Sequence, residues 1–231
     1  MIEAGSARQE RFGLSVLGTR AWVSALLVTP VRARVLFALA HGAGAGMDHP
    51  FLQVVAEDLA DAGVATLRFQ FPYMEEGRRR PDPPHLLEAT VRSAVAAARE
   101  RLPHLPLIAG GKSMGGRMTS QAQAKQPLEG VRGIVFLGFP LHPRGRPGDR
   151  RAEHLAHVSV PMLFLQGSRD QLATLERLAP VCRRLGKRAH LHVIDGADHS
   201  FSVLKRSGRT HEQVLAELVD AIAAWSEALI G

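Results

Sequence analysis

The sequence predicts an α/β fold with a mostly parallel central sheet flanked by helices. Short runs dense in apolar residues alternate with longer segments whose apolar residues recur at helical spacing. Strand–helix–strand order of this kind implies parallel strands joined by right-handed crossovers. In the middle of the chain, the apolar run 105–109 leads into the glycine-rich turn 111–116 and the helix-compatible stretch 117–125. A strand, a sharp turn and a helix are therefore expected there.

The length and composition fit one domain spanning residues 1–231. A chain of 231 residues with 45% hydrophobic content can bury a substantial core. Residues 1–10 include acidic side chains and no apolar segment of the signal-peptide type, and no uninterrupted apolar run reaches membrane-spanning length. The single cysteine, Cys182, cannot form an internal disulfide, which fits a reducing compartment. We expect a cytoplasmic protein without a membrane span, with Cys182 packed in a helix.

The chain is basic, with a formal net charge of +7, and its arginines greatly outnumber its lysines. The arginines are scattered except for the triplet 78–80 and a looser set within 144–151. No aromatic residues are interleaved with them, as they would be in a stacking platform for nucleic acid. A solvated surface is favoured over a specific nucleic-acid partner, because net charge bears on solubility and steering. Anionic substrates remain open, and the sequence predicts no oligomeric state.

The elements are expected in the following order. A strand beginning at Leu14 and a second at 22–29, with a turn at 18–20, form an antiparallel hairpin. Residues 35–40 are dense enough in apolar side chains for a strand buried on both faces. Further strands are expected at 64–69, 131–138, 158–165 and 189–194, and helices at 51–62, 85–102, 172–185 and 212–229.

Ser113 stands at the apex of the central turn, with Gly111 and Gly115 two positions away on either side. A serine at the apex of such a turn adopts forced backbone angles, and only glycines let the strand and the helix pass so closely. The hydroxyl would then stand clear of the sheet as a nucleophile. The Gly-x-Ser-x-Gly pattern alone is weak evidence, so the rest of the chain must support this interpretation.

Two residues that follow later strands complete a candidate site. Asp170 comes after the strand at 158–165, and His199 lies in the loop after 189–194. A carboxylate there would accept a hydrogen bond from the imidazole Nδ1–H and fix the tautomer whose Nε2 takes the serine proton. The alternative role for Asp170 is to cap the following helix. Asp198 adjoins His199 in sequence and cannot easily reach its Nδ1.

Three loops bear on the substrate. Clustered glycines at 41–50 let backbone N–H groups approach a ligand oxygen, unless this segment is simply a flexible turn. The irregular segment 70–84 carries Phe71, Tyr73 and Met74, which either line a pocket or plug the loop onto the core. The segment 139–151 is too short for a large lid, so we expect an open site suited to small acyl groups.

These motifs together resemble the α/β-hydrolase superfamily. In chain order, Ser113, Asp170 and His199 match its nucleophile, acid and base. The segment 68–73 and Lys112 look more narrowly like dienelactone hydrolase-like proteins and the group containing testis-expressed protein 30 and its chromatin-complex relative. The resemblance spans residues 35–201 and is carried by Gly111-Lys112-Ser113-Met114-Gly115-Gly116, His41-Gly42-Ala43-Gly44, Gln166-Gly167-Ser168-Arg169-Asp170 and Gly196-Ala197-Asp198-His199-Ser200-Phe201.

The resemblance implies an α/β-hydrolase fold with a minimal lid, and an oxyanion held by the backbone N–H groups of Ala43 and Met114, with Gly44 as the alternative to Ala43. Tyr73 is expected beside the substrate. We predict a serine hydrolase that acts on a small ester or thioester through an acyl-enzyme. No cofactor and no metal are expected, because the histidines lack a paired ligand spacing such as His-Glu-x-x-His. The alternative is a catalytically silent hydrolase-fold protein whose basic surface binds a partner.

Overall fold

The computed structural model describes residues 7–230, and its centre is an eight-stranded sheet. The strand order is β1-β2-β4-β3-β5-β6-β7-β8. β2 pairs antiparallel with β1 and β4, whereas all other neighbouring strands are parallel. This confirms the predicted sheet. The strands are β1 (Arg8–Ser15), β2 (Trp22–Thr29), β3 (Val35–Ala40), β4 (Val64–Phe69), β5 (Leu107–Lys112), β6 (Val131–Leu137), β7 (Met162–Gly167) and β8 (Ala189–Ile194).

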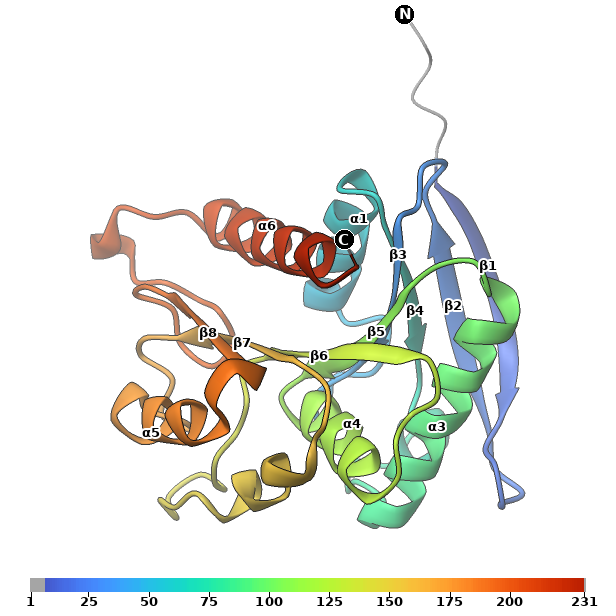
Figure 1. The fold of residues 1–231 in the computed structure, drawn as a ribbon, viewed down its shortest axis with the longest axis horizontal. Helices are drawn as coiled ribbons and strands as arrows, with labels where there is room; N and C mark the ends of the chain where they lie inside the picture. The colour runs from blue at the N-terminus through green and yellow to red at the C-terminus, as the bar shows by residue number, and fades with distance from the viewer. Residues whose placement is uncertain (1–6, 231) are drawn as a thin grey trace, which may run out of the picture.

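Helices cover both faces of this sheet (Figure 1). On one face, α1 (Pro50–Asp61) lies beside α6 (His211–Ile230), and on the other face lie α3 (Pro84–Arg101), α4 (Met114–Lys125) and α5 (Leu175–Leu185). These layers are those of the predicted α/β fold. The shorter helical segments are α2 (Pro72–Glu75), η1 (Arg150–His157), η2 (Gly186–Arg188) and η3 (Lys205–Ser207).

The core lies between these helices and the sheet. Every residue of β3 and of β4 is buried, as a strand covered on both faces requires. Along β3, side chains alternate between the two sides: Leu36 packs with the cluster under α3 and α4, whereas Phe37 packs with the cluster under α1 and α6. The central strands are therefore fixed in register from both sides, and so are the loops that follow them.

Several of the predicted element boundaries are wrong. β1 begins at Arg8 and not near Leu14, because an edge strand with an exposed face carries polar residues and lacks an apolar signal. β5 continues to Lys112, so the turn before α4 is tighter than expected. β7 begins at Met162, after Pro161, rather than at 158. A short helix, α2, lies within the segment expected to be irregular.

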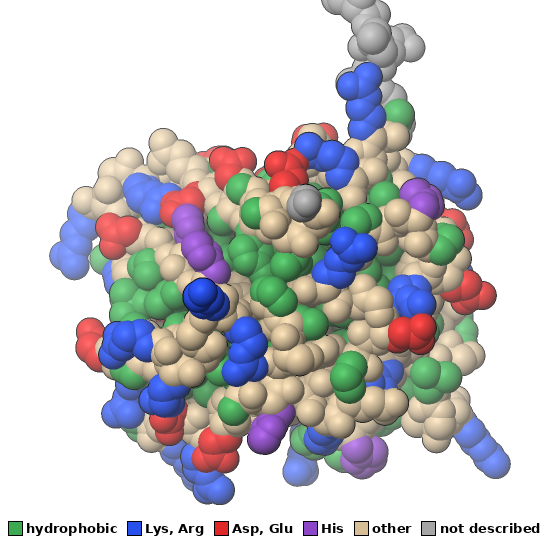
Figure 2. Space-filling model, viewed as in Figure 1, with side chains coloured by type: hydrophobic (Ala, Val, Ile, Leu, Met, Phe, Trp, Pro, Cys, Tyr) green, Lys and Arg blue, Asp and Glu red, His purple; other side chains and the backbone are tan. Residues whose placement is uncertain are grey.

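Charged side chains are dispersed over the surface. On the face shown in Figure 2, the basic side chains are scattered among acidic and uncharged ones and do not form one continuous patch. Within residues 7–230, no helix combines the length and the apolar character needed to cross a membrane.

Candidate active site

Ser113 is the single residue between β5 and α4, and its backbone is strained. Its φ of 50° lies in the left-handed region, which L-residues other than glycine seldom adopt. The neighbouring glycines make this turn feasible by leaving room for the backbone. A Cβ atom added at Gly111 would lie 2.1 Å from the carbonyl oxygen of Ala40, and one added at Gly115 would lie 2.6 Å from that same atom. The turn thus holds the serine at the carboxyl end of β5.

The structure brings Ser113, His199 and Asp170 together in one chain of hydrogen bonds. The Oγ of Ser113 lies 2.8 Å from Nε2 of His199. Nδ1 of the same ring lies 2.6 Å from Oδ2 of Asp170. The three residues are separated by up to 86 positions in the chain and meet at the carboxyl edge of the sheet.

The environment of Asp170 decides where the histidine carries its proton. Asp170 is 1% exposed, and its carboxylate also accepts hydrogen bonds from the side chain of Gln166 at 2.6 Å and from the backbone N–H of Leu172 at 2.7 Å. An ionised carboxylate only accepts, so Nδ1 of His199 must be the donor. Nε2 is then free to accept the hydroxyl proton of Ser113. This leaves the serine next to a base of the correct tautomer.

Two backbone N–H groups near Ser113 have no acceptor. Within residues 7–230, neither Ala43 N–H nor Met114 N–H makes a hydrogen bond. Met114 N–H is one of the unpaired donors at the start of α4. The third predicted donor, Gly44, is occupied, because its N–H donates to the hydroxyl of Tyr73 at 3.0 Å. Of the three predicted donors, Ala43 and Met114 are therefore the two whose N–H groups remain free.

The side chains of Tyr73 and His41 contact the glycine-rich loop from the protein interior. Tyr73, which the sequence predicts beside the substrate, is fully buried, and its hydroxyl accepts a hydrogen bond from the N–H of Gly44. His41 is also fully buried, with Nδ1 donating to the carbonyl of Gly42 at 2.7 Å and Nε2 accepting from the N–H of Phe71 at 3.0 Å. Burial lowers the pKa of His41 to about 4, which keeps the ring neutral.

Lys112 connects the loop that carries His199 (residues 195–201, the histidine loop) to the turn that carries Ser113 (residues 111–116, the serine turn). The sequence pattern alone did not predict this role. Its Nζ donates to the backbone carbonyl of His199 at 2.5 Å and lies 5.2 Å from the ring centre of Phe201. Burial lowers the pKa of Lys112 to about 8, against the opposing effect of Asp170 and Asp198. In the sequence, Lys112 is a single charged residue between the buried strand β5 and the glycines of the turn. That position could have indicated a specific contact for its ammonium group.

A cavity of about 410 Å³ lies beside Ser113. One wall comes from α4 and the loop at Ala43. The other comes from residues 138–161, which we call the β6–β7 connection. Arg117 also lines this cavity, one helical turn after Ser113, and this spacing is the signal in the sequence that points to it. The lining residues are Ala43, Pro81, Asp82, Pro84, Leu87, Ser113, Met114, Arg117, Met118, Pro140, His142, Pro143, Arg144, Arg151 and Leu172.

The remaining candidates near the site have structural roles. The carboxylate of Asp198 accepts hydrogen bonds from the N–H groups of Ser200 and Ser202, not from His199. In residues 7–230, no three His, Cys, Asp or Glu side chains gather in a way that would hold a metal ion.

Comparison with known proteins places this arrangement in a family. A family model described as an alpha/beta hydrolase domain matches residues 32–227. The chain belongs to the α/β-hydrolase family. The sheet order, the flanking helices and the position of Ser113 after β5 are consistent with this assignment.

Solved α/β-hydrolase structures superpose over nearly the whole chain. A dienelactone hydrolase from Anabaena variabilis matches with a TM-score of 0.74 and 25% identity, covering 95% of this chain and 97% of that protein. XC6422 from Xanthomonas campestris, described as an a/b serine hydrolase without lid, matches with a TM-score of 0.72 and 17% identity, covering 96% and 95% of the two chains. The second likeness shows the fold alone.

A curated relative from Mycobacterium tuberculosis carries the name "Putative phosphoribosyl transferase". It is 31% identical over 183 residues, which make up 78% of this chain. The matched region covers only 39% of the relative, so this α/β-hydrolase chain corresponds to well under half of that protein.

Proposed function

We propose that this protein is a serine hydrolase that cleaves a small ester or thioester through an acyl-enzyme. The observation that carries the proposal is the continuous hydrogen-bonded chain from Asp170 to His199 to Ser113, at 2.6 and 2.8 Å. These distances are within the range required for proton transfer from a serine nucleophile to a histidine base.

In the first half of the proposed reaction, the Ser113 hydroxyl attacks the carbonyl carbon as His199 Nε2 takes its proton. The carbonyl oxygen becomes an oxyanion and accepts hydrogen bonds from the N–H groups of Ala43 and Met114. Asp170 stabilises the imidazolium. The bond from the carbonyl carbon to the leaving group then breaks, and the imidazolium returns its proton to the departing alcohol or thiol.

In the second half, a water molecule gives a proton to His199 and attacks the acyl-enzyme through the same oxyanion contacts. The acid is released and Ser113 regains its hydroxyl proton. The cavity volume of about 410 Å³ and the short β6–β7 connection favour small acyl groups over long lipid chains.

A fluorophosphonate label tests this function directly. We expect labelling of the folded protein at Ser113 and its loss in Ser113→Ala, together with a fall in kcat for short-chain esters on the order of 10⁶-fold. Ser200→Ala is the matched control, because this exposed serine adjoins His199 but has no part in the hydrogen-bonded chain. A folded wild-type protein that takes up no label and cleaves no ester or thioester would favour a silent hydrolase-fold protein that binds a partner.

The narrower assignments rest on residues outside the reaction. We place the chain with the group containing testis-expressed protein 30 on the basis of segment 68–73 and Lys112, and in the cytoplasm on the basis of the buried free thiol of Cys182. The name of the Mycobacterium tuberculosis relative refers to phosphoribosyl transfer. We assign that activity to the part of the relative that this chain does not match.

A further inference from the structure

Three arginines line the cavity beside Ser113 without a carboxylate partner. Arg117 comes from α4, Arg144 from the loop of the β6–β7 connection and Arg151 from η1. None of the three forms an ion pair within residues 7–230. A desolvated arginine usually has its charge balanced, and Arg117 and Arg151 are partly buried, so their unpaired guanidinium groups beside one cavity favour a bound anion.

Arg117 and Arg151 lie close enough to repel one another. The Nε atom of Arg117 is buried and has no hydrogen-bond partner. Burial and the charge of Arg151 lower the pKa of Arg117 to about 10, and burial also lowers the pKa of Arg151. Both guanidinium groups stay protonated at neutral pH, so the two positive charges persist in a partly desolvated wall.

Two carboxylates near these arginines, Asp82 and Glu88, already pair with other cations. Asp82 lines the cavity, but its Oδ2 accepts from the N–H of Tyr73 at 2.8 Å and its Oδ1 accepts from Arg78 at 2.7 Å. Glu88 acts on Arg117 from a distance and is held by Lys125 Nζ at 2.6 Å. These contacts leave the cavity with net positive charge.

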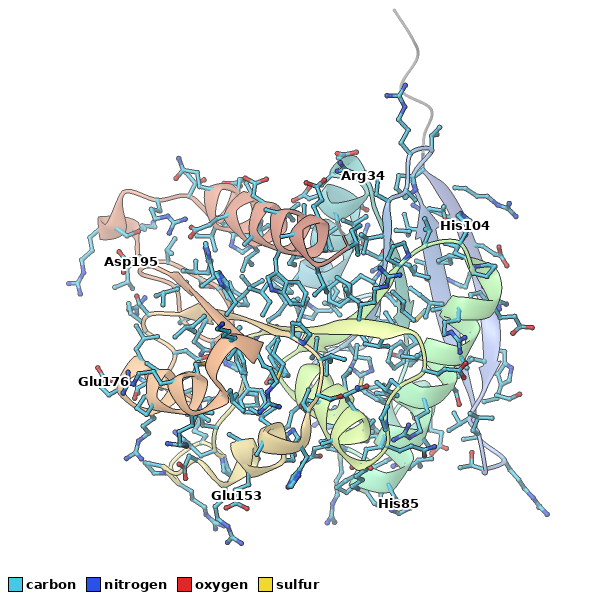
Figure 3. The ribbon with its side chains drawn as sticks, in the orientation of Figure 1. Arg34, His85, His104, Glu153, Glu176 and Asp195 are labelled. Carbon is cyan, nitrogen blue, oxygen red and sulfur yellow. The ribbon has the colours of Figure 1, made fainter. Side chains whose placement is uncertain are left out.

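The one acidic side chain on η1 faces away from the cavity. Glu153 projects from the periphery of the molecule (Figure 3) and lies 4.0 Å from the exposed Arg150. Arg150 is thus a neighbour of Arg151 in sequence but is absent from the cavity lining. Arg151 lines the cavity and Arg150 does not, so the same substitution at these two adjacent positions separates an effect on the cavity from an effect on surface charge.

From this arrangement we infer that the cavity is a subsite for a doubly charged phosphoryl group carried by the substrate, next to the ester that Ser113 attacks. Guanidinium groups bind phosphoryl oxygens through paired hydrogen bonds, and two negative charges balance the neighbouring guanidinium groups of Arg117 and Arg151, whereas a single carboxylate would balance only one of them. The inference rests on the proposed function and narrows its substrate class to phosphorylated small esters or thioesters.

Three p-nitrophenyl esters of matched length test this subsite: the neutral pentanoate, the singly charged glutarate monoester and the doubly charged 4-phosphonobutanoate. For the wild type, we expect kcat/KM to be highest for the phosphonate, at least 10-fold above the pentanoate, since hydrogen bonds between oppositely charged groups are stronger than those between neutral groups. We expect Arg151→Met to lower this ratio on the order of 10-fold and Arg150→Met to preserve it. Arg144→Met, at an exposed loop position, is the second variant should Arg151→Met fail to fold.

Equal rates for all three esters would overturn the subsite and leave the hydrolase intact. A preference for the glutarate monoester equal to that for the phosphonate would overturn the assignment to a phosphoryl group. The subsite is also tested without turnover, through thermal stabilisation by inorganic phosphate. We expect stabilisation of the wild type, Ser113→Ala and Arg150→Met and its loss in Arg151→Met. Phosphate stabilisation without ester cleavage would contradict the proposed function alone, whereas its absence from the wild type would contradict the subsite.

Discussion

The serine turn and the β6–β7 connection line the same cavity, but they differ in how tightly they are packed. A Cβ atom added at Gly115, in the turn, would lie 2.6 Å from two backbone carbonyl oxygens, those of Ala40 and His41. A Cβ atom added at Gly148, in the connection, would meet no atom within 4 Å. The turn tolerates almost no change of side chain, whereas the part of the connection around Gly145 and Gly148 leaves room for many.

This difference separates chemistry from recognition. The proposed nucleophile and one oxyanion donor, Ser113 and Met114, lie on the packed side, where their positions are set by backbone contacts. The cavity arginines Arg144 and Arg151 lie on the open side, where a substitution costs little stability. Specificity can therefore vary in the connection while the reacting groups stay fixed. Each prediction below tests one part of this separation.

The largest expected effect is on the packed side. We expect Asp170→Asn to lower kcat on the order of 10⁴-fold for every ester, because a neutral amide no longer stabilises the imidazolium of His199. Steady-state hydrolysis of a short-chain ester measures this. Asp198→Asn is the control, since its carboxylate bonds only to the N–H groups of Ser200 and Ser202. Equal losses in the two variants would show that general loop disorder, not Asp170, accounts for the effect.

The packed side is also the part that the sequence predicts well. The bounds 64–69 and 189–194 coincide with β4 and β8, because continuous apolar or alternating runs between turn residues define them. The meeting of Ser113, Asp170 and His199 follows from a topological rule, since residues after parallel strands share one edge of the sheet. Local sequence and sheet geometry suffice for these features.

Features that depend on irregular backbone could not be predicted in the same way. Tyr73 was expected beside the substrate, but the short helix α2 turns its side chain under the glycine loop. The contact of Lys112 with the carbonyl of His199 joins the end of β5 to a loop 87 residues later and follows from no periodicity. Whether Arg150 or Arg151 faces the cavity depends on the rotation of a 3₁₀ segment, which the sequence alone does not fix.

A pair of glycine substitutions gives the second largest effect and tests the packing difference itself. We expect Gly115→Ala to lower the free energy of unfolding by about 3 kcal/mol, because the new methyl group overlaps backbone atoms that cannot move aside. Gly148→Ala should change it by no more than about 0.5 kcal/mol. Urea unfolding of the two variants measures both values. Similar losses would mean that the connection is as tightly constrained as the turn.

A dependence of stability on pH is expected to originate at Lys112. Its pKa is about 8 in the folded protein, against 10.5 as the ordinary value, so between these pH values the unfolded chain binds more protons. From about pH 8 to 9, below the pH at which the thiol of Cys182 titrates in the unfolded chain, the free energy of unfolding should then rise with pH by at most about 1.4 kcal/mol per pH unit. Lys112→Met should remove this slope.

Urea unfolding at several pH values measures that slope, with Lys125→Met as the control. Lys125 is mostly exposed and pairs with Glu88 on the surface of α4, so its loss should leave the rise above pH 8 in place. A slope that persists in Lys112→Met would mean that the cation next to Ser113 is solvated in the folded state. The contact of Lys112 with the loop that carries His199 would then contribute little to stability. The tightly packed side of the cavity would include the turn at Ser113 but not that loop.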